Sequence, residues 1–115
     1  MKKLILFIIL LFCFQTNAAS KYKFYGKIKL TSTIDEDNKK HTYDIISLSK
    51  PENVYIYSGD ESFHNVNKIQ LNYMGKKLKI KYDKPATVYC KNVYSADSMY
   101  HFTDVICIVG KIKYK

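Results

Sequence analysis

A stretch near the C-terminus, YSADSMYHFTDVIC (residues 94–107), gathers residue types that do chemistry. Serine, histidine, aspartate and cysteine lie within 14 positions of one another. A Ser–His–Asp relay needs its members in mutual hydrogen-bond contact, with the nucleophile beside its base. The alternative is that the stretch forms the tip and the second strand of a β-hairpin.

The cysteines on either side of this tip predict a register for the hairpin. We expect strands at residues 87–94 and 101–109, and Cys90 directly opposite Cys107 would place Ala96 opposite His101. Apolar residues then meet apolar ones and the polar tip falls at the turn. A disulfide in this position would close a loop of about 18 residues, worth roughly 3 kcal/mol in the chain-entropy account.

Side-chain alternation along the second strand separates the reactive residues. His101 shares a face with Cys107, whereas Asp104 points to the opposite face. Neither Ser95 nor Ser98 has a Gly-x-Ser-x-Gly elbow around it. We therefore expect no catalytic residues and no enzyme. An enzyme would need a buried acid or base, and its candidates would be His101, Asp97 and Asp104.

Metal binding is also disfavoured by spacing. The histidines, His41, His64 and His101, are isolated from one another, and no Cys-x-x-Cys motif is present. The acidic run 35–37 lacks the spaced ligands and the terminal glutamate of a calcium loop. We expect a solvated turn there, and neither a metal nor a cofactor.

The N-terminus has the pattern of a secretory signal peptide. Lys2 and Lys3 precede an apolar run from Leu4 to Phe14, and small residues follow at Ala18 and Ala19. The run is shorter than the roughly 20 apolar residues that span a bilayer. We expect residues 1–19 to be removed and residues 20–115 to form one exported domain, periplasmic or extracellular, with no transmembrane segment. A retained N-terminal anchor is the alternative.

The chain beyond residue 19 is basic and carries two cysteines. Seventeen lysines face 10 acidic residues, giving a net charge near +7, and the chain contains no arginine. Bidentate guanidinium recognition of phosphate or carboxylate is therefore excluded, whereas general attraction to acidic partners remains. An even cysteine pair in an exported chain favours a Cys90–Cys107 disulfide.

Composition and periodicity indicate an all-β fold. Tyrosine, phenylalanine, isoleucine, valine and threonine are abundant, and no amphipathic helix pattern occurs. Six or seven short strands, separated by turn signals, predict a small antiparallel barrel or sandwich. We expect them after Gly26 and at 42–48, 54–57, 66–73, 78–82, 87–94 and 101–109, with further alternation at the C-terminus.

Residues 45–109 resemble a family of small exported bacterial proteins known as domain of unknown function 4431. The matching segments are ISLSKP (46–51), IQL (69–71), VYSA (93–96) and YHFTDV (100–105). Where that family tends to have consecutive histidines, this chain has Tyr100-His101-Phe102. The resemblance implies an oligonucleotide/oligosaccharide-binding-like (OB-like) β-barrel and no particular reaction.

The leading functional hypothesis is a non-enzymatic binding module for an anionic or glycan-type ligand of the cell envelope. Aromatic rings beside lysines suit stacking on sugars and attraction to anions. The expected binding residues are Lys77, Lys79, Lys81, Tyr100, His101, Lys111 and Lys113. The alternative is that these lysines bind no ligand and only protect strand edges and keep a small domain soluble.

A second hypothesis is an inhibitor or immunity protein. A surface near +7 would steer fast association with an acidic toxin or envelope enzyme. No native nucleic-acid partner is expected for an exported protein.

Overall fold

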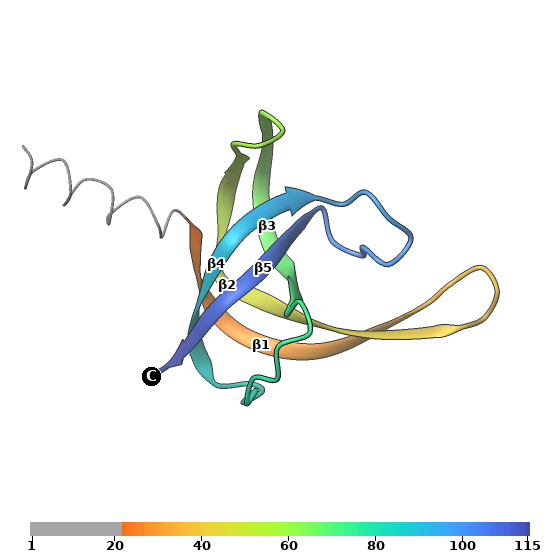
Figure 1. Cartoon of the computed structure of the whole chain (residues 1–115), viewed down its shortest axis with the longest axis horizontal. Helices are drawn as coiled ribbons and strands as arrows, with labels where there is room; N and C mark the ends of the chain where they lie inside the picture. Colours follow the sequence, from red (N-terminus) through yellow and green to blue (C-terminus); the bar gives the residue numbers. More distant parts are fainter. Residues whose placement is uncertain (1–21) are drawn as a thin grey trace, which may run out of the picture.

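The structure, a computed structural model, describes residues 22–115, so the expected signal peptide at residues 1–19 lies outside the described part. It contains five strands: β1 (Tyr22–Ile34), β2 (Lys40–Ile56), β3 (Glu61–Asn72), β4 (Pro85–Ser95) and β5 (Val105–Tyr114). They form a closed barrel in the order β1-β2-β3-β5-β4 (Figure 1). No helix capable of crossing a membrane occurs between residues 22 and 115.

This arrangement confirms the expected all-β, OB-like barrel. The strand pairs are antiparallel with one exception, since β3 and β5 run parallel. The barrel is thus antiparallel except at the seam where β3 and β5 close it. Closure through β3 and β5 leaves no free edge in the central part of the sheet.

Gly26 allows β1 to serve two neighbours. Residues 26–34 of β1 pair with β2, whereas residues 22–27 pair with β4. At the crossover a Cβ on Gly26 would lie 1.9 Å from the carbonyl oxygen of Ser47. Only a residue without a side chain fits this approach, and beyond it β1 moves away from β2.

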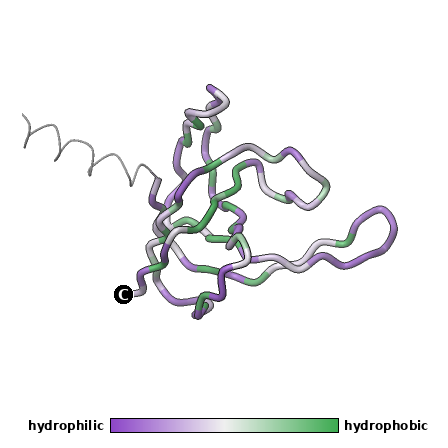
Figure 2. Tube along the Cα trace, viewed as in Figure 1, coloured by the Kyte–Doolittle hydropathy of each residue, from purple (hydrophilic) through white to green (hydrophobic). Residues whose placement is uncertain are grey.

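Alternate residues of all five strands fill the barrel. Ile28, Ile46, Ile69 and Val88 are completely buried, and green apolar segments of the tube converge on the interior (Figure 2). The hairpin tip between β1 and β2 is purple and polar in the same view, as expected for the acidic run that begins at Asp35.

One long strand replaces two of the expected strands. β2 contains 42–48 and, up to its end at Ile56, the expected strand at 54–57, and its pairing with β3 shifts register between Ser47 and Glu52. The shift accommodates Pro51, which donates no backbone hydrogen bond, so the sequence indicated a break where the structure has an irregularity. The segment 61–64, outside the expected strands, belongs to β3.

The expected strand at 78–82 is absent. Leu78 and Ile80 do alternate inward against the core, but this segment pairs with no strand. Isolated bonds hold the segment: the Asp83 amide donates to Ile28 O at 3.0 Å, and the Lys81 amide donates to Tyr114 Oη at 2.8 Å. The alternation of apolar residues and lysines therefore predicted correctly that Leu78 and Ile80 face the core, but it did not predict that this segment lacks strand pairing.

The last expected strand begins too early. β5 starts at Val105 and continues without interruption to Tyr114, so residues 96–104 form a nine-residue loop instead of a tight hairpin tip. This loop, called the β4–β5 loop below, contains both Tyr100 and His101.

Candidate functional site

The β4–β5 loop covers the outer side of β2 and β3. In OB-like barrels this face and the loops beside it bind ligands. Here the Phe102 ring stacks on Tyr43 of β2, with centroids 4.7 Å apart and planes 21° from parallel. His41 lies 5.5 Å from Phe102 and 5.8 Å from Tyr100. The protein's own aromatic side chains therefore take the place that a ligand ring would occupy.

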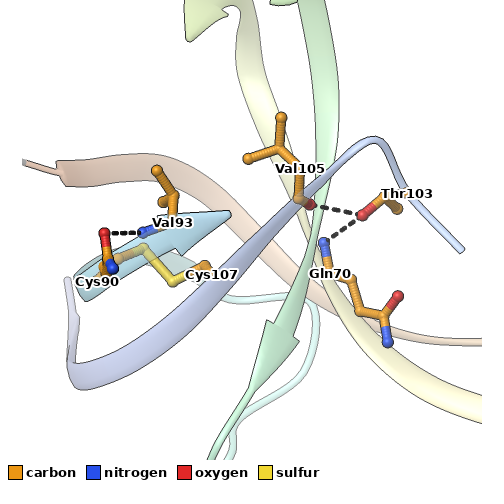
Figure 3. Close-up of a disulfide and its surroundings, with 7 residues drawn as sticks. Gln70, Cys90, Val93, Thr103, Val105 and Cys107 are labelled. Atoms are coloured by element: carbon orange, nitrogen blue, oxygen red, sulfur yellow. Dashed lines mark hydrogen bonds between the residues drawn. A yellow bond between two sulfur atoms is a disulfide. The ribbon is translucent and has the colours of Figure 1, made fainter. Parts of the chain in front are cut away.

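Gln70 of β3 ties the loop down through its backbone and its side chain. Its Nε2 donates to Tyr100 O at 3.0 Å, and its Oε1 accepts the Phe102 amide at 2.8 Å. The Gln70 amide donates to Thr103 Oγ1 at 2.9 Å, and that hydroxyl donates to Val105 O at 2.7 Å (Figure 3). Gln70 and Thr103 are both buried, so these bonds are shielded from water and hold the face closed.

The opposite side of this contact is held by a hydrogen bond between a histidine and a carboxylate. His41 Nε2 lies 2.6 Å from Asp35 Oδ2. Hydrogen bonding to His41, followed by hydrogen bonding to the Lys39 amide, holds the pKa of Asp35 below its ordinary value. The β1–β2 tip thus positions the imidazole against the aromatic side chains of the loop.

No Ser–His–Asp relay forms around His101, although Asp97 Oδ1 lies 3.1 Å from His101 Nδ1. His101 Nδ1 accepts the Asp97 amide at 3.0 Å, and its ring packs 5.3 Å from Tyr94. The Ser98 hydroxyl accepts the Tyr100 amide at 3.2 Å rather than contacting the imidazole. The expected alternation of His101 and Asp104 on one strand is wrong, because both precede β5.

Tyr100 and His101 border a small hollow of about 210 Å³ beside Gln70 and Tyr94. Tyr100 is 60% exposed, so of these two expected binding residues it alone presents its ring to solvent. His101 is mainly occupied in holding the loop conformation.

Cys90 and Cys107 form the expected disulfide, with their Cα atoms 5.6 Å apart (Figure 3). The expected register is wrong. Cys90 pairs with Val109 and Cys107 pairs with Val93, because β4 carries an irregularity between Tyr89 and Asn92. The bridge therefore crosses the β4–β5 pair diagonally, and both sulfurs lie inside the barrel, where they join the core instead of facing His101.

Three adjacent strands carry the main positive surface. β1, β4 and β5 lie side by side in the order β1-β4-β5, and together they hold six lysines and no acidic residue. We call this outward surface the lysine face. Its lysines are all exposed: Lys23, Lys27 and Lys29 on β1, Lys91 on β4, and Lys111 and Lys113 on β5.

Strand register arranges part of the lysine face in rows. Lys23 pairs with Tyr89, and Tyr89 pairs with Lys111 on its other side. The Lys111 ammonium lies 4.7 Å from the Tyr89 ring centroid, a cation–π contact. Strand spacing places the two lysines of this row about 10 Å apart.

The second row repeats the pattern one step along the strands. Tyr25 pairs with Thr87, and Thr87 pairs with Lys113. The Lys23 ammonium lies 5.9 Å from the Tyr25 ring, which links the two rows. The exposed Tyr25 ring and the partly buried Tyr89 ring thus each lie beside a lysine ammonium group.

A second pair of lysines extends this surface at its edge. The amino groups of Lys76 and Lys91 are in contact, and this contact lowers the pKa of Lys76. In the described part of the chain, no acidic side chain forms a salt bridge with either lysine. The site therefore holds an excess of positive potential that a bound anion would neutralise.

The lysines expected at residues 77–81 lie on the segment between β3 and β4. Lys77, Lys79 and Lys81 are exposed there, and Lys81 places its ammonium 5.5 Å from the Tyr114 ring. Only Lys111 and Lys113, among the expected binding residues, belong to the rows. Sequence reasoning missed Lys23 and Tyr25, because their place beside β4 depends on long-range pairing.

Within residues 22–115, no three His, Cys, Asp or Glu side chains come close enough together to hold a metal ion. Comparisons of the chain with protein-family models, with curated proteins and with solved structures gave no match.

Proposed function

We propose that this protein is an exported, non-enzymatic binding module that holds an anionic polymer of the cell envelope on its lysine face. The observation that carries the proposal is the separation of charge. Six exposed lysines share three adjacent strands, while all 10 acidic residues of the chain lie outside those strands. A polymer with repeated negative groups can meet several of these lysines together.

The shape and chemistry of the lysine face favour a polymer over a small anion. The face is an outer sheet surface, its cations are all lysines, and the chain offers no guanidinium fork for one phosphate or carboxylate. Each exposed contact in such a surface is weak, so affinity must come from several contacts made at once. Binding of this kind falls steeply as salt rises.

Two further features support the proposal. The β2–β3 face, where OB-like barrels usually bind, is filled by Phe102 and latched by Gln70. The buried Cys90–Cys107 disulfide fits an oxidising compartment outside the cytoplasm. An exported protein with a closed β2–β3 face would therefore meet envelope polymers through its lysine face.

The test replaces lysines of the two rows and measures binding to polygalacturonate and to inorganic polyphosphate. In the triple variant Lys23→Gln, Lys111→Gln and Lys113→Gln, affinity for both polymers is expected to fall at least roughly tenfold. Its affinity should also depend less on salt between about 50 and 200 mM, because fewer counterions are released on binding. Titration calorimetry at several salt concentrations measures both quantities.

A matched control removes the same amount of charge elsewhere. The triple variant Lys39→Gln, Lys40→Gln and Lys68→Gln leaves the lysine face intact and should bind within about threefold of the wild type. Equal losses in the two triple variants would contradict the assignment of the lysine face. A wild-type protein that ignores both polymers but forms a stoichiometric complex with an acidic protein would overturn the proposal in favour of an inhibitor.

A further inference from the structure

A tyrosine-lined groove opens beside the lysine face, between the start of β1 and the second half of β2. Pairing of β1 with β2 ends at Gly26 and Leu48, and toward the N-terminus β1 follows β4 instead. Opposite this departure, β2 carries its irregularity at residues 48–51. The two strands separate, and side chains rather than a backbone ladder line the space between them.

Two neighbouring hollows make up the groove. One, of about 360 Å³, is bordered by Tyr25, Lys50 and Glu52. The other, of about 280 Å³, is bordered by Lys23, Tyr55 and Glu52 among others, so Glu52 joins the two. These volumes lie near the lower end of the range for small-molecule sites, which is about 300–1,000 Å³.

The far end of the groove is fixed by Tyr22. Its hydroxyl donates to Tyr55 O at 3.0 Å and accepts the Tyr57 amide at 3.2 Å, which ties β1 to the end of β2. The rings of Tyr55 and Tyr57 meet edge to face at 4.8 Å, and the Tyr55 hydroxyl donates to Asp60. The aromatic wall is thus held in place before any ligand arrives, which lowers the entropic cost of binding.

The lining combines the groups that recognise a sugar ring. Tyr25 and Tyr55 are 47% and 40% exposed, so each offers an aromatic surface against which the apolar C–H side of a pyranose can pack. The Glu52 carboxylate can accept hydrogen bonds from sugar hydroxyl groups. The Lys50 ammonium can donate hydrogen bonds to substituents of the sugar ring or pair with an acidic substituent.

We infer that this groove is a subsite for one sugar unit of an acidic polysaccharide whose remaining negative groups lie on the lysine face. The inference rests on the proposed function and narrows its ligand class from anionic polymers in general to acidic glycans. Lys23 and Tyr25 carry the connection, because both border the groove and both belong to the lysine face. A polymer strand can therefore continue from the groove onto the rows without a break.

The test compares one aromatic and one apolar substitution at Tyr25 on two polymers. Tyr25→Leu removes the ring and should weaken binding of polygalacturonate at least roughly fivefold, whereas Tyr25→Phe keeps the ring and should stay within about twofold. Neither variant should change binding of inorganic polyphosphate by more than about twofold, because that polymer has no ring to stack. Calorimetry gives the affinities, and circular dichroism confirms that the exposed position leaves the fold unchanged.

The possible outcomes distinguish the sugar subsite from the proposed binding of anionic polymers on the lysine face. Two results in Tyr25→Leu would overturn the sugar subsite but not the lysine face as a binding surface. One is an equal loss of affinity for polyphosphate and polygalacturonate, and the other is an unchanged affinity for polygalacturonate. Failure of the wild type to bind either polymer overturns both. Loss confined to polygalacturonate, with recovery in Tyr25→Phe, supports the subsite.

Discussion

Asp44 is the carboxylate on which the segment between β3 and β4 depends. It is 9% exposed, and two tyrosine hydroxyls donate to it: Tyr73 at 2.6 Å and Tyr82 at 3.0 Å. Burial, and then the hydrogen bond to Asp44, raises the pKa of Tyr73 far above its ordinary value. These bonds satisfy a charge that would otherwise be costly to bury and attach the segment to β2.

Tyr73→Phe tests this anchor. The variant leaves the buried carboxylate with one donor fewer and should lower the free energy of unfolding by roughly 1–3 kcal/mol at pH 7. Tyr82→Phe is the matched control, because Tyr82 is 41% exposed and water can replace its hydroxyl, so a smaller loss is expected. Urea unfolding of the three proteins measures the differences.

The sign of the pH dependence follows from the raised pKa. The ionised form of Tyr73 is disfavoured in the folded state, so its stabilising contribution is complete below pH 10 and declines as pH rises above the ordinary pKa of 10.0. The advantage of the wild type over Tyr73→Phe should therefore shrink in alkaline solution. An advantage that is absent at pH 7, or that grows above pH 10, would contradict this role.

At the scale of elements, the crossover of β1 at Gly26 creates both the closed barrel and the groove. The same residue pairs with Leu48 on β2 and with Ala86 on β4, so the two ladders meet at one position. Any side chain there would push the carbonyl of Ser47 away and disturb both ladders.

Gly26→Ala should lower the free energy of unfolding by about 3 kcal/mol or more, because the clash is with backbone and not with a mobile side chain. Gly59→Ala provides the comparison. Its added Cβ would meet only the Glu61 carboxylate at 3.0 Å, which can rotate away, and the expected cost is under about 1 kcal/mol. Equal effects in thermal or urea unfolding would show that Gly26 is not required at the crossover.

Local signals predicted the features that depend on local geometry. The acidic run 35–37 forms the expected solvated turn, and β4 contains the strand expected at 87–94. The disulfide partners were also correct, because Cys90 and Cys107 were the only pair left in the expected domain. The exact register was not, since the irregularity at Tyr89–Asn92 has no sequence signal.

Features that depend on tertiary contacts could not be predicted from the sequence. Pro51 indicates the end of a strand, yet an irregularity lets β2 continue past it. The side-chain alternation of residues 101–105 predicts a strand in what is the β4–β5 loop. The loop lies across β2 and β3 because it is hydrogen-bonded to Gln70, some 30 residues earlier in the chain.

At the scale of the whole molecule, charge is distributed unevenly around the barrel. β1, β4 and β5 carry only lysines among their charged residues, and acids such as Asp35, Glu52, Asp60 and Asp104 occupy the other strands and the loops. Such separation orients the protein toward a negative surface before contact is made. Alternation in the sequence is enough to predict that Lys111 and Lys113 point outward. Their position on the same face as Lys23 depends on closure of the barrel, which places β1 and β5 on either side of β4.

The most direct test of the account is to locate polygalacturonate on the protein by NMR. Amide chemical shifts should change on β1 at residues 22–27, on β4 at 87–91 and on β5 at 110–113, with further changes along the groove at 49–55. Amides of the β4–β5 loop and of His41 and Tyr43 should change little, because Phe102 already fills that face. Shifts concentrated on the β4–β5 loop, on β3 and on β2 at residues 41–47, with none on the lysine face, would contradict the account.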